Sequence, residues 1–176
     1  QAEDGIRDVE RSRGLGDVYK RQDKDRAIKL NNKFNYLEGL FDLVLIDCPP
    51  SLNILTVNAL AVSDYVIIPT QCEYYALEGL TALLETIDKI KVSVNEGLKI
   101  GGILRTMYDP RNNLAQDVSF ELESHFGKNV LNTIIPRNVS LAEAPSYGSS
   151  IISYDKASKG SMSYLALAGE LVRTSK

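Results

Sequence analysis

The sequence predicts a three-layer α/β/α fold with a mostly parallel β-sheet. Two observations predict it. Short continuous apolar runs alternate with longer segments in which apolar residues recur every three or four positions, and polar or Pro-containing turns separate the two kinds of segment. Strands that alternate with helices of this length form right-handed βαβ units, in which consecutive strands lie parallel.

The elements can be assigned in order along the chain. Between Asp23 and Leu40, apolar residues form an imperfect helical stripe, which we interpret as the end of a helix. The apolar run that ends at Asp47 is typical of a strand covered on both faces. The full set of expected elements is strand Leu43–Asp47, helix Ser51–Ser63, strand Tyr65–Pro69, helix Ala76–Val92, strand Lys99–Met107, helix Leu114–Phe126, strand Val130–Ile135 and helix Ser158–Arg173.

Two of these helices carry a clear apolar stripe, which predicts the face that each packs on the sheet. In the first helix the stripe consists of Leu77, Leu80, Leu84 and Ile87. In the second it consists of Leu114, Val118 and Leu122.

Asp47 is the residue with the clearest chemical implication. It closes a buried strand at the carboxyl end, which is where open α/β sheets bind ligands. A lone carboxylate there costs several kcal/mol unless hydrogen bonds or a cation compensate it. Two interpretations stay open: the acid binds a magnesium ion with phosphate, or it caps the following loop. Pro49 and Pro50 then remove two backbone donors, and Ser51 is the expected N-cap of the next helix.

The stretch FDLVLIDCPPSLNILTVNALAVSDYVIIPTQCEYYALEGL closely resembles the Walker B and switch II region of the ParA/Soj chromosome- and plasmid-partitioning ATPases. These belong to the deviant-Walker P-loop proteins, which also include MinD. The likeness continues through GGILRTMYDPRNNL, TIIPRNVSLAEAPSYG and ISYDKASKGSMSYLALAGEL, and covers roughly residues 36 to 173. The resemblance implies a P-loop NTPase-like fold that uses ATP and Mg²⁺.

The resemblance also implies roles for individual residues. Asp47 matches the Walker B acid, which holds magnesium through water, and Pro49, Pro50 and Ser51 match switch II. Cys48 has no His near it in sequence, and the single His, His125, is expected on the surface of a helix. We therefore expect Cys48 to be a small buried thiol and not a nucleophile.

Two strand ends resemble the walls of the family's adenine pocket. Met107 would supply apolar contact with the ring, while Pro136 and Arg137 offer backbone groups and Asn138 an amide. The alternative is that both are ordinary turns containing Pro and Asn.

Non-specific DNA binding is the family's other activity, and it depends on basic residues that the ATP-bound dimer gathers on one surface. The candidates are Arg105, Arg111, Lys156 and Lys159, although such charges also occur on ordinary solvated surfaces. Relatives often carry further basic residues where this chain has Ser140 and Ser153, which predicts weaker DNA binding.

The glycine-rich phosphate loop, GxxxxGK[ST], does not occur in the sequence. We therefore expect an N-terminally truncated domain, residues 23–176 being the C-terminal part of a ParA-like ATPase. Residues 1–22 alternate in charge and resemble translated adaptor-derived sequence, so we interpret them as a disordered or non-native leader, with a native polar linker as the alternative. Without neighbours for the Leu43–Asp47 strand, we expect an aggregation-prone chain that does not hydrolyse ATP.

Composition excludes some classes of function. The net charge of −3 gives no bulk attraction to nucleic acid, and the two Cys residues lack metal-ligand spacing. The absence of a signal segment or a long apolar run favours a cytoplasmic protein. The resemblance implies that it associates with the nucleoid, and the few cations of the tail predict no stable membrane association. The predicted function is a partitioning ATPase that dimerises with ATP, binds DNA and is stimulated by a ParB-type partner. The alternatives are a MinD-like cell-division positioner and a non-catalytic interaction module.

Overall fold

The computed structural model describes residues 34, 39–49, 51 and 53–174. It consists of two units, residues 1–62 and residues 63–176, and each is described by itself below. The helical stripe expected between residues 23 and 40 falls almost entirely outside the described residues, as does the leader.

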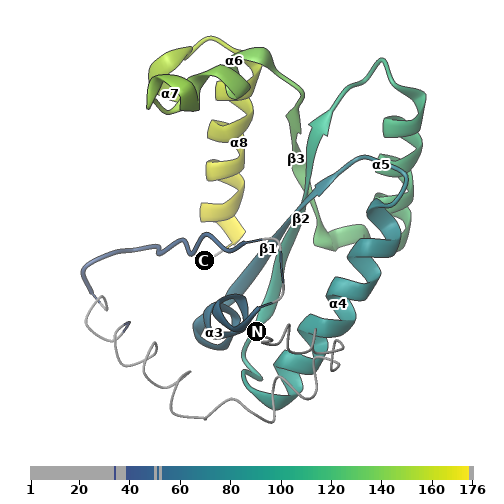
Figure 1. Ribbon diagram of the computed structural model, residues 1–176, viewed down its shortest axis with the longest axis vertical. Coiled ribbons are helices and arrows are strands. Elements are labelled where there is room, and N and C mark those ends of the chain that lie inside the picture. The colour runs from purple at the N-terminus through teal and green to yellow at the C-terminus, as the bar shows by residue number, and fades with distance from the viewer. Residues whose placement is uncertain (1–33, 35–38, 50, 52, 175–176) are drawn as a thin grey trace, which may run out of the picture. The chain divides into compact units, whose positions relative to one another are not determined.

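The second unit contains a three-stranded parallel sheet in the order β1, β2, β3 (Figure 1). The strands are β1 (Tyr65–Gln71), β2 (Lys99–Tyr108) and β3 (Val130–Pro136). All three were predicted, and each extends one or two residues further at its carboxyl end than the apolar run alone indicated.

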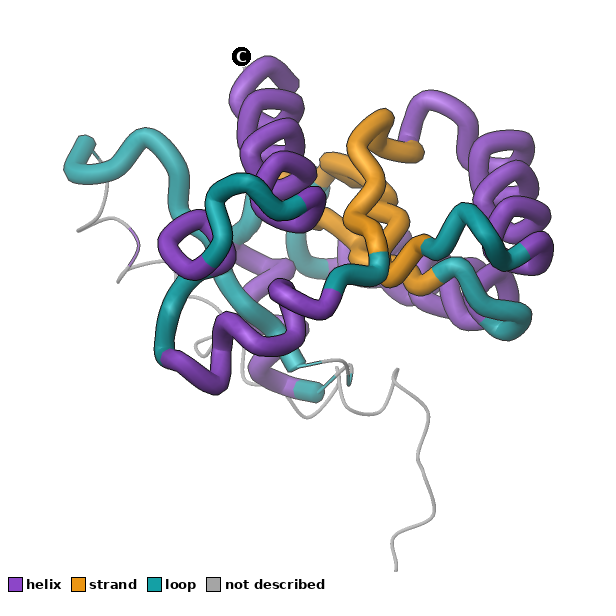
Figure 2. The backbone as a smooth tube through the Cα atoms, turned by 90° about the horizontal axis from the view of Figure 1, so that it is seen from above, coloured by secondary structure: helices purple, strands orange, loops and turns teal. Residues whose placement is uncertain are grey.

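Helices cover the sheet on both sides, which confirms the predicted layers. The helices α4 (Ala76–Ser93) and α5 (Asn113–Phe126) lie on one side and α8 (Lys159–Thr174) on the other (Figures 1 and 2). Two successive right-handed crossovers in the same direction place α4 and α5 on the same face. Short helical pieces precede α8, and the sequence did not predict them: η1 (Gly127–Asn129), α6 (Val139–Glu143), η2 (Ala144–Tyr147) and α7 (Ile151–Tyr154).

The core follows the alternation of side chains along the strands. On the face that α8 covers, the buried apolar residues are Leu104, Leu131, Ile135 and Leu167, with Ile67, Leu141 and Leu171 packed against them. Ile103 is fully buried and points to the opposite face, because it precedes Leu104 in the same strand.

The predicted stripe of α4 is confirmed at Leu80 and Ile87, which are 3% and 2% exposed. The predicted stripe of α5 is confirmed at Val118 and Leu122, but it is wrong at Leu114, which is 44% exposed. Ala115 is buried in its place. The reason is helix geometry: with 3.6 residues per turn, strict four-residue steps drift by about 40° each, and a mixed three- and four-residue spacing stays on one face.

The first unit departs most from expectation, since residues 43–47 form no strand. They lie in an irregular segment in which Leu43, Leu45 and Ile46 are 54%, 76% and 37% exposed. A strand forms only where neighbouring strands satisfy its backbone, and no described strand pairs with this segment. The following helix, α3 (Ile54–Val62), is capped by Asn53 and not by Ser51, because the Asn53 Oδ1 atom accepts from the N–H groups of Leu55 and Thr56 at 2.9 and 3.2 Å.

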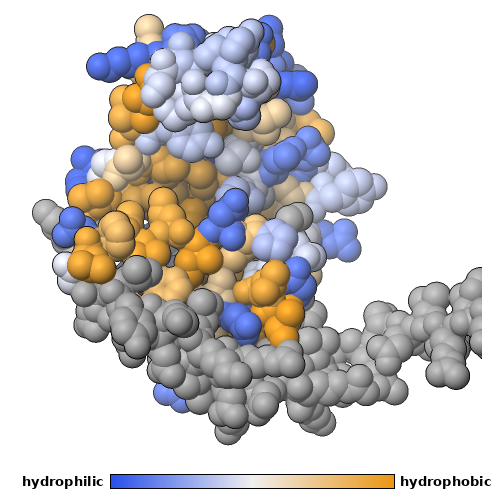
Figure 3. Space-filling model, turned by 60° about the vertical axis from the view of Figure 1, so that its left-hand side comes forward, coloured by the Kyte–Doolittle hydropathy of each residue, from blue (hydrophilic) through white to orange (hydrophobic). Residues whose placement is uncertain are grey.

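Apolar side chains reach the surface in several places, as Figure 3 shows for one face. The run from Leu40 to Ile46 adds to them, since Leu40, Phe41 and Leu45 are all more than half exposed. We predict that Leu45→Glu increases the soluble, monodisperse fraction of the chain and lowers its binding of a hydrophobic dye. The matched variant Leu80→Glu, at a buried position, is expected to prevent folding. Equal solubility and dye binding for Leu45→Glu and the unaltered chain would contradict this interpretation.

Gly102 permits a close approach between β2 and the side chain of Leu131. A Cβ atom at Gly102 would lie 2.5 Å from both Cγ and Cδ2 of Leu131, which is itself 6% exposed and has little room to move. We predict that Gly102→Ala lowers the free energy of unfolding by about 1–3 kcal/mol, measured by urea denaturation. Gly79→Ala is the control: a Cβ there meets nothing within 4 Å, so in the interior of α4 it is expected to stabilise by up to about 1 kcal/mol. An unchanged midpoint of urea denaturation for Gly102→Ala would show that the approach of Leu131 to Gly102 is not tight.

Candidate functional site

The carboxyl ends of β2 and β3 bring three of the predicted base-binding residues to the same edge of the sheet. Tyr108 pairs with Pro136 in the register of the two strands, and the Arg137 N–H donates to the Tyr108 carbonyl oxygen at 2.9 Å. Met107 precedes Tyr108 directly. Met107, Pro136 and Arg137 therefore lie next to one another at the end of the sheet where α/β proteins bind ligands.

Met107 has an unusual backbone conformation. Its φ is +53°, and it is the one residue other than glycine with a positive φ among the described residues. The register explains this value, because β2 advances three residues between Arg105 and Tyr108 while β3 advances two between their partners. The extra residue forms a bulge that re-aims a side chain. The Met107 side chain is 51% exposed at the strand end, and the left-handed backbone there costs about 1–2 kcal/mol.

Asn138 has a local task that the sequence analysis did not assign. Its Oδ1 atom accepts from the Leu141 N–H at 3.0 Å and so caps α6. This use of the oxygen limits what the Asn138 side chain offers to a ligand, and leaves the amide nitrogen as its contribution.

An ion pair follows β2 directly. The Arg111 guanidinium donates to both carboxylate oxygens of Asp109, with Nε to Oδ1 at 3.0 Å and Nη2 to Oδ2 at 2.8 Å. The Arg111 N–H also donates to Asp109 Oδ1, at 3.0 Å. These hydrogen bonds lower the pKa of Asp109 to about 2, and the charges of Arg111 and Arg137 act in the same direction.

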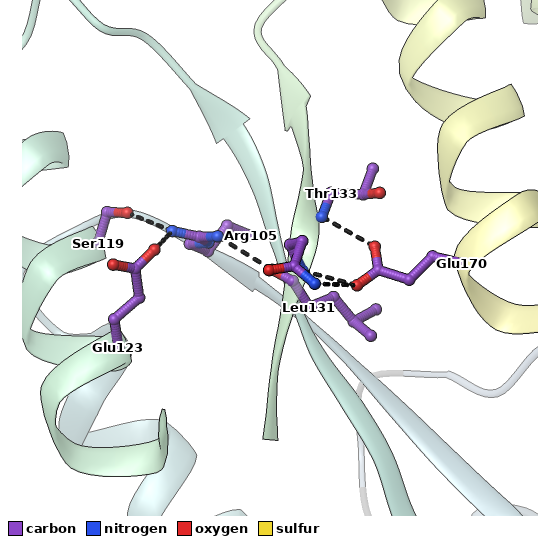
Figure 4. A network of polar contacts seen from close by, with 7 residues as sticks. Arg105, Ser119, Glu123, Leu131, Thr133 and Glu170 are labelled. Carbon is purple, nitrogen blue, oxygen red and sulfur yellow. Dashed lines mark hydrogen bonds and ion pairs between the residues drawn. The ribbon is translucent and has the colours of Figure 1, made fainter. Parts of the chain in front are cut away.

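Arg105 does not belong with the other basic residues predicted to bind DNA. It is 4% exposed, and its guanidinium donates to Ser119 Oγ at 2.8 Å and to the Leu131 carbonyl oxygen at 2.9 Å, and pairs with Glu123 (Figure 4). A buried guanidinium committed to partners on α5 and β3 cannot present itself to a phosphate. The sequence did carry a signal for this structural role, since Arg105 interrupts an apolar strand.

The other basic candidates stay on the surface. Lys156 lies in the turn before α8, Lys159 is the first residue of α8, and the side chain of Arg111 is 87% exposed. Ser140 and Ser153, which stand where relatives often carry basic residues, both have hydrogen-bond partners within the protein. The Ser140 hydroxyl donates to Asp155 Oδ2 at 3.0 Å, and Ser153 Oγ lies 3.1 Å from Ser150 Oγ.

Asp47, Pro49 and Ser51 belong to the first unit, and Pro50 lies outside the described residues. The Asp47 side chain is exposed on the irregular segment, which contradicts the expected strand end. Among the residues that the structure describes, no three His, Cys, Asp or Glu side chains cluster in a way that could hold a metal ion. We assign no catalytic step to a metal ion.

Neither Cys48 nor His125 is placed for nucleophilic chemistry. Burial and the charge of Asp47 raise the pKa of the Cys48 thiol, which keeps it protonated. Cys48 is half-buried, so the prediction of a buried thiol holds only in part. His125 is exposed on α5, as predicted, where its Nδ1 atom lies 2.9 Å from the Glu121 carbonyl oxygen.

An open groove of about 780 Å³ lies beside β3 and α8. It contains none of the predicted base-binding residues. Its walls are formed by Asn132, Thr133, Ile134, Ser163, Leu165, Ala166, Gly169, Glu170 and Arg173. The Glu170 carboxylate in this groove binds the backbone of β3, a role that the sequence analysis missed.

Comparison with known sequences identifies relatives of this chain. The family model described as an AAA domain matches residues 17–100. The chain is 51% identical over 150 residues to the chromosome-partitioning ATPase Soj of Treponema pallidum, covering 85% of this chain and 59% of that protein. It is 52% identical over 149 residues to the chromosome partitioning protein ParA of Myxococcus xanthus, covering 85% of this chain and 53% of that protein. The chain thus spans little more than half the length of these relatives.

Solved structures show the same fold. Cobyrinic acid a,c-diamide synthase from Mycobacterium smegmatis, with a bound ATP analog and magnesium, matches with a TM-score of 0.70 and 33% identity, over 91% of this chain and 58% of that one. The cell division ATPase MinD of Pyrococcus furiosus matches with a TM-score of 0.65 and 23% identity, over 91% of this chain and 62% of that one, which shows the fold alone.

Within the described residues, the helices fall short of the length and apolar character that a membrane crossing requires.

The Asp109–Arg111 pair predicts a specific acid titration. Because the folded-state pKa of Asp109 is about 2, against an ordinary value of 3.8, the pair contributes stability above that ordinary value and loses it as the pH falls towards 2. Carbon-13 NMR of the carboxyl group is expected to show this low midpoint, and Arg111→Met is expected to return it towards 3.8. Lys156→Met, which removes another exposed cation, serves as the control. If the titration midpoint of Asp109 does not change in Arg111→Met, the ion pair is not the cause of the low pKa.

Proposed function

Because the chain belongs to the ParA/Soj family of partitioning ATPases, we propose that it supplies the base-binding side of a nucleotide site in an ATPase of chromosome or plasmid partitioning. In this proposal ATP closes a dimer that binds DNA non-specifically, and a ParB-type partner stimulates hydrolysis and release. The protein acts in the cytoplasm on the nucleoid, and Mg²⁺ accompanies the ATP. The observation that supports it best is the exposed, left-handed Met107 beside the turn that begins at Pro136.

The residues of this edge suit the two sides of an adenine ring. Met107 offers a polarizable thioether and Pro136 an apolar ring, both of which pack well on the face of a base. The Arg137 N–H is already bonded to Tyr108, so the Arg137 carbonyl oxygen is the backbone group that would accept from the amino group of adenine. The Asn138 amide nitrogen would donate to a ring nitrogen.

The remaining roles follow from family membership. Asp47 is proposed as the Walker B acid, with Pro49, Pro50 and Ser51 as the switch that responds to the phosphate. Arg111, Lys156 and Lys159 are proposed as the DNA-binding residues, while Arg105 is withdrawn because of its burial. Ser140 and Ser153 reduce the number of cations available, so the expected DNA affinity is modest.

A MinD-like role at the membrane is the second candidate, because MinD belongs to the same deviant-Walker group that the sequence resembles. A membrane-binding helix needs a cationic face, and α8 does not offer one, since Arg173 is the basic residue of its last turn. Sedimentation with anionic liposomes separates the two candidates, because only the MinD-like protein is expected to co-sediment.

Saturation-transfer NMR with millimolar ATP and GTP tests the base site directly. We expect saturation of the adenine protons of ATP, a weaker effect on GTP, and a loss of at least about threefold in Met107→Gly, because the thioether no longer covers the ring. The same variant is expected to raise the free energy of unfolding by about 1 kcal/mol, since glycine relieves the left-handed strain. Higher stability together with weaker binding would show that the strained backbone of Met107 serves nucleotide binding. A strain without a role in binding would change the stability alone.

Met162→Ala provides the control for this experiment, because Met162 is also an exposed methionine, on α8, with 63% exposure against 51% for Met107. It is expected to leave both nucleotides unaffected. Identical saturation of ATP by the unaltered chain and Met107→Gly, or no saturation at all, refutes the proposed base site.

A further inference from the structure

We propose that Arg105 and Glu170 are positioning residues for the base site: they hold a bulge in β3 from its two sides and thereby set how the turn at residues 136–138 leaves the sheet. This inference rests on the proposed function, because it explains how the base-binding edge acquires its geometry. Neither residue lies at the edge itself.

The register of β2 and β3 locates the bulge. Ile103 pairs with Val130 and Arg105 pairs with Ile134, so β3 advances four residues while β2 advances two. The additional residues of β3 fall between Val130 and Ile134. Such a bulge leaves backbone groups outside the ladder of hydrogen bonds, and these groups need other partners.

Charged side chains from two other elements supply those partners (Figure 4). From α8, Glu170 Oε1 accepts from the Asn132 N–H at 2.7 Å, and Glu170 Oε2 accepts from the Thr133 N–H at 2.9 Å. From β2, Arg105 Nη2 donates to the Leu131 carbonyl oxygen at 2.9 Å. Three successive residues of the bulge are therefore held by one anion and one cation.

Each of the two charges is itself fixed in place. Arg105 is held by Ser119 and Glu123 of α5, so its orientation depends on the helix that covers the other side of the sheet. Glu170 also accepts from the Asn132 amide nitrogen at 3.2 Å. Burial raises the pKa of Glu170, but its hydrogen bonds from Thr133 and Asn132 outweigh that effect and hold the pKa below its ordinary value.

The bulge lies directly before the base-binding edge. After it, Arg105 pairs with Ile134, and the second irregularity of the register places Met107 in its left-handed conformation before Tyr108 meets Pro136. A slip of β3 at the bulge would change which β3 residue faces Tyr108 and would separate Met107 from Pro136. The two charges thus act on the base site through the register of β3.

The experiment uses Glu170→Gln and Arg105→Met in the complete chain, and measures two quantities at a temperature well below unfolding. The first is amide hydrogen exchange at Asn132 and Thr133, which reports the bulge. The second is the ratio of saturation transfer to ATP and to GTP, which reports the base site. Glu121→Gln on α5 and Lys99→Met on β2 are the matched controls, since they remove a half-exposed and an exposed charge from the same layers.

We expect Glu170→Gln to speed exchange at both amides by at least about tenfold, because charge-assisted hydrogen bonds are lost, and to reduce the preference for ATP several-fold. The controls are expected to change neither quantity. Glu170 is only partly buried on α8, so this variant remains measurable even if Arg105→Met does not fold.

The outcomes separate the two proposals. Faster amide exchange with an unchanged preference for ATP shows that the contacts of Glu170 with the bulge are merely structural, and overturns the positioning role. Unchanged exchange in Glu170→Gln shows that Glu170 does not hold the bulge. If the unaltered chain binds neither nucleotide, the proposed function fails, and the positioning role fails with it.

Discussion

The buried guanidinium of Arg105 is the constraint on which the sheet unit depends. A charge that is 4% exposed must find partners for its donors, and it does so on α5 and on the backbone of β3. Within the described residues, Nε of Arg105 is left without a hydrogen-bond partner, so the remaining bonds carry the compensation for lost hydration. This requirement ties one helical layer and two strands to a common geometry, since none of them can shift without uncovering the charge.

The consequence of that geometry is visible at the carboxyl edge of the sheet. A bulge in β3 and a second irregularity in β2 occur on neighbouring strands within a few residues, and the strands return to a shared register where Tyr108 meets Pro136. Met107 lies within the second irregularity and has a strained, left-handed backbone conformation. Strain of this kind persists only where surrounding contacts over-determine it, and it concentrates at sites of ligand contact.

The two units of the chain illustrate different physical situations. In residues 63–176 the strands pack against helices, and strand residues such as Ile103, Leu104 and Ile135 are buried. In the first unit the run around Leu45 has the composition of a central strand but remains exposed and irregular. We propose that this run carries the Walker B acid, and the chain spans little more than half of its relatives' length. Both sides of the site are proposals. The proposed base side rests on the register and backbone geometry at the ends of β2 and β3, whereas the proposed phosphate side rests on the family relationship.

The sequence by itself determined the fold class and the order of the elements from Tyr65 onwards, because the periodicity of apolar residues is a local property of the chain. It also marked the residues at the strand ends, since turn chemistry is local as well. Only the tertiary structure decided that residues 43–47 form no strand, that Arg105 is buried and not on a DNA-binding surface, and that Met107 adopts a positive φ. Each of these depends on pairing, register or desolvation between residues far apart in the sequence, and no local pattern of apolar and polar residues specifies such relations.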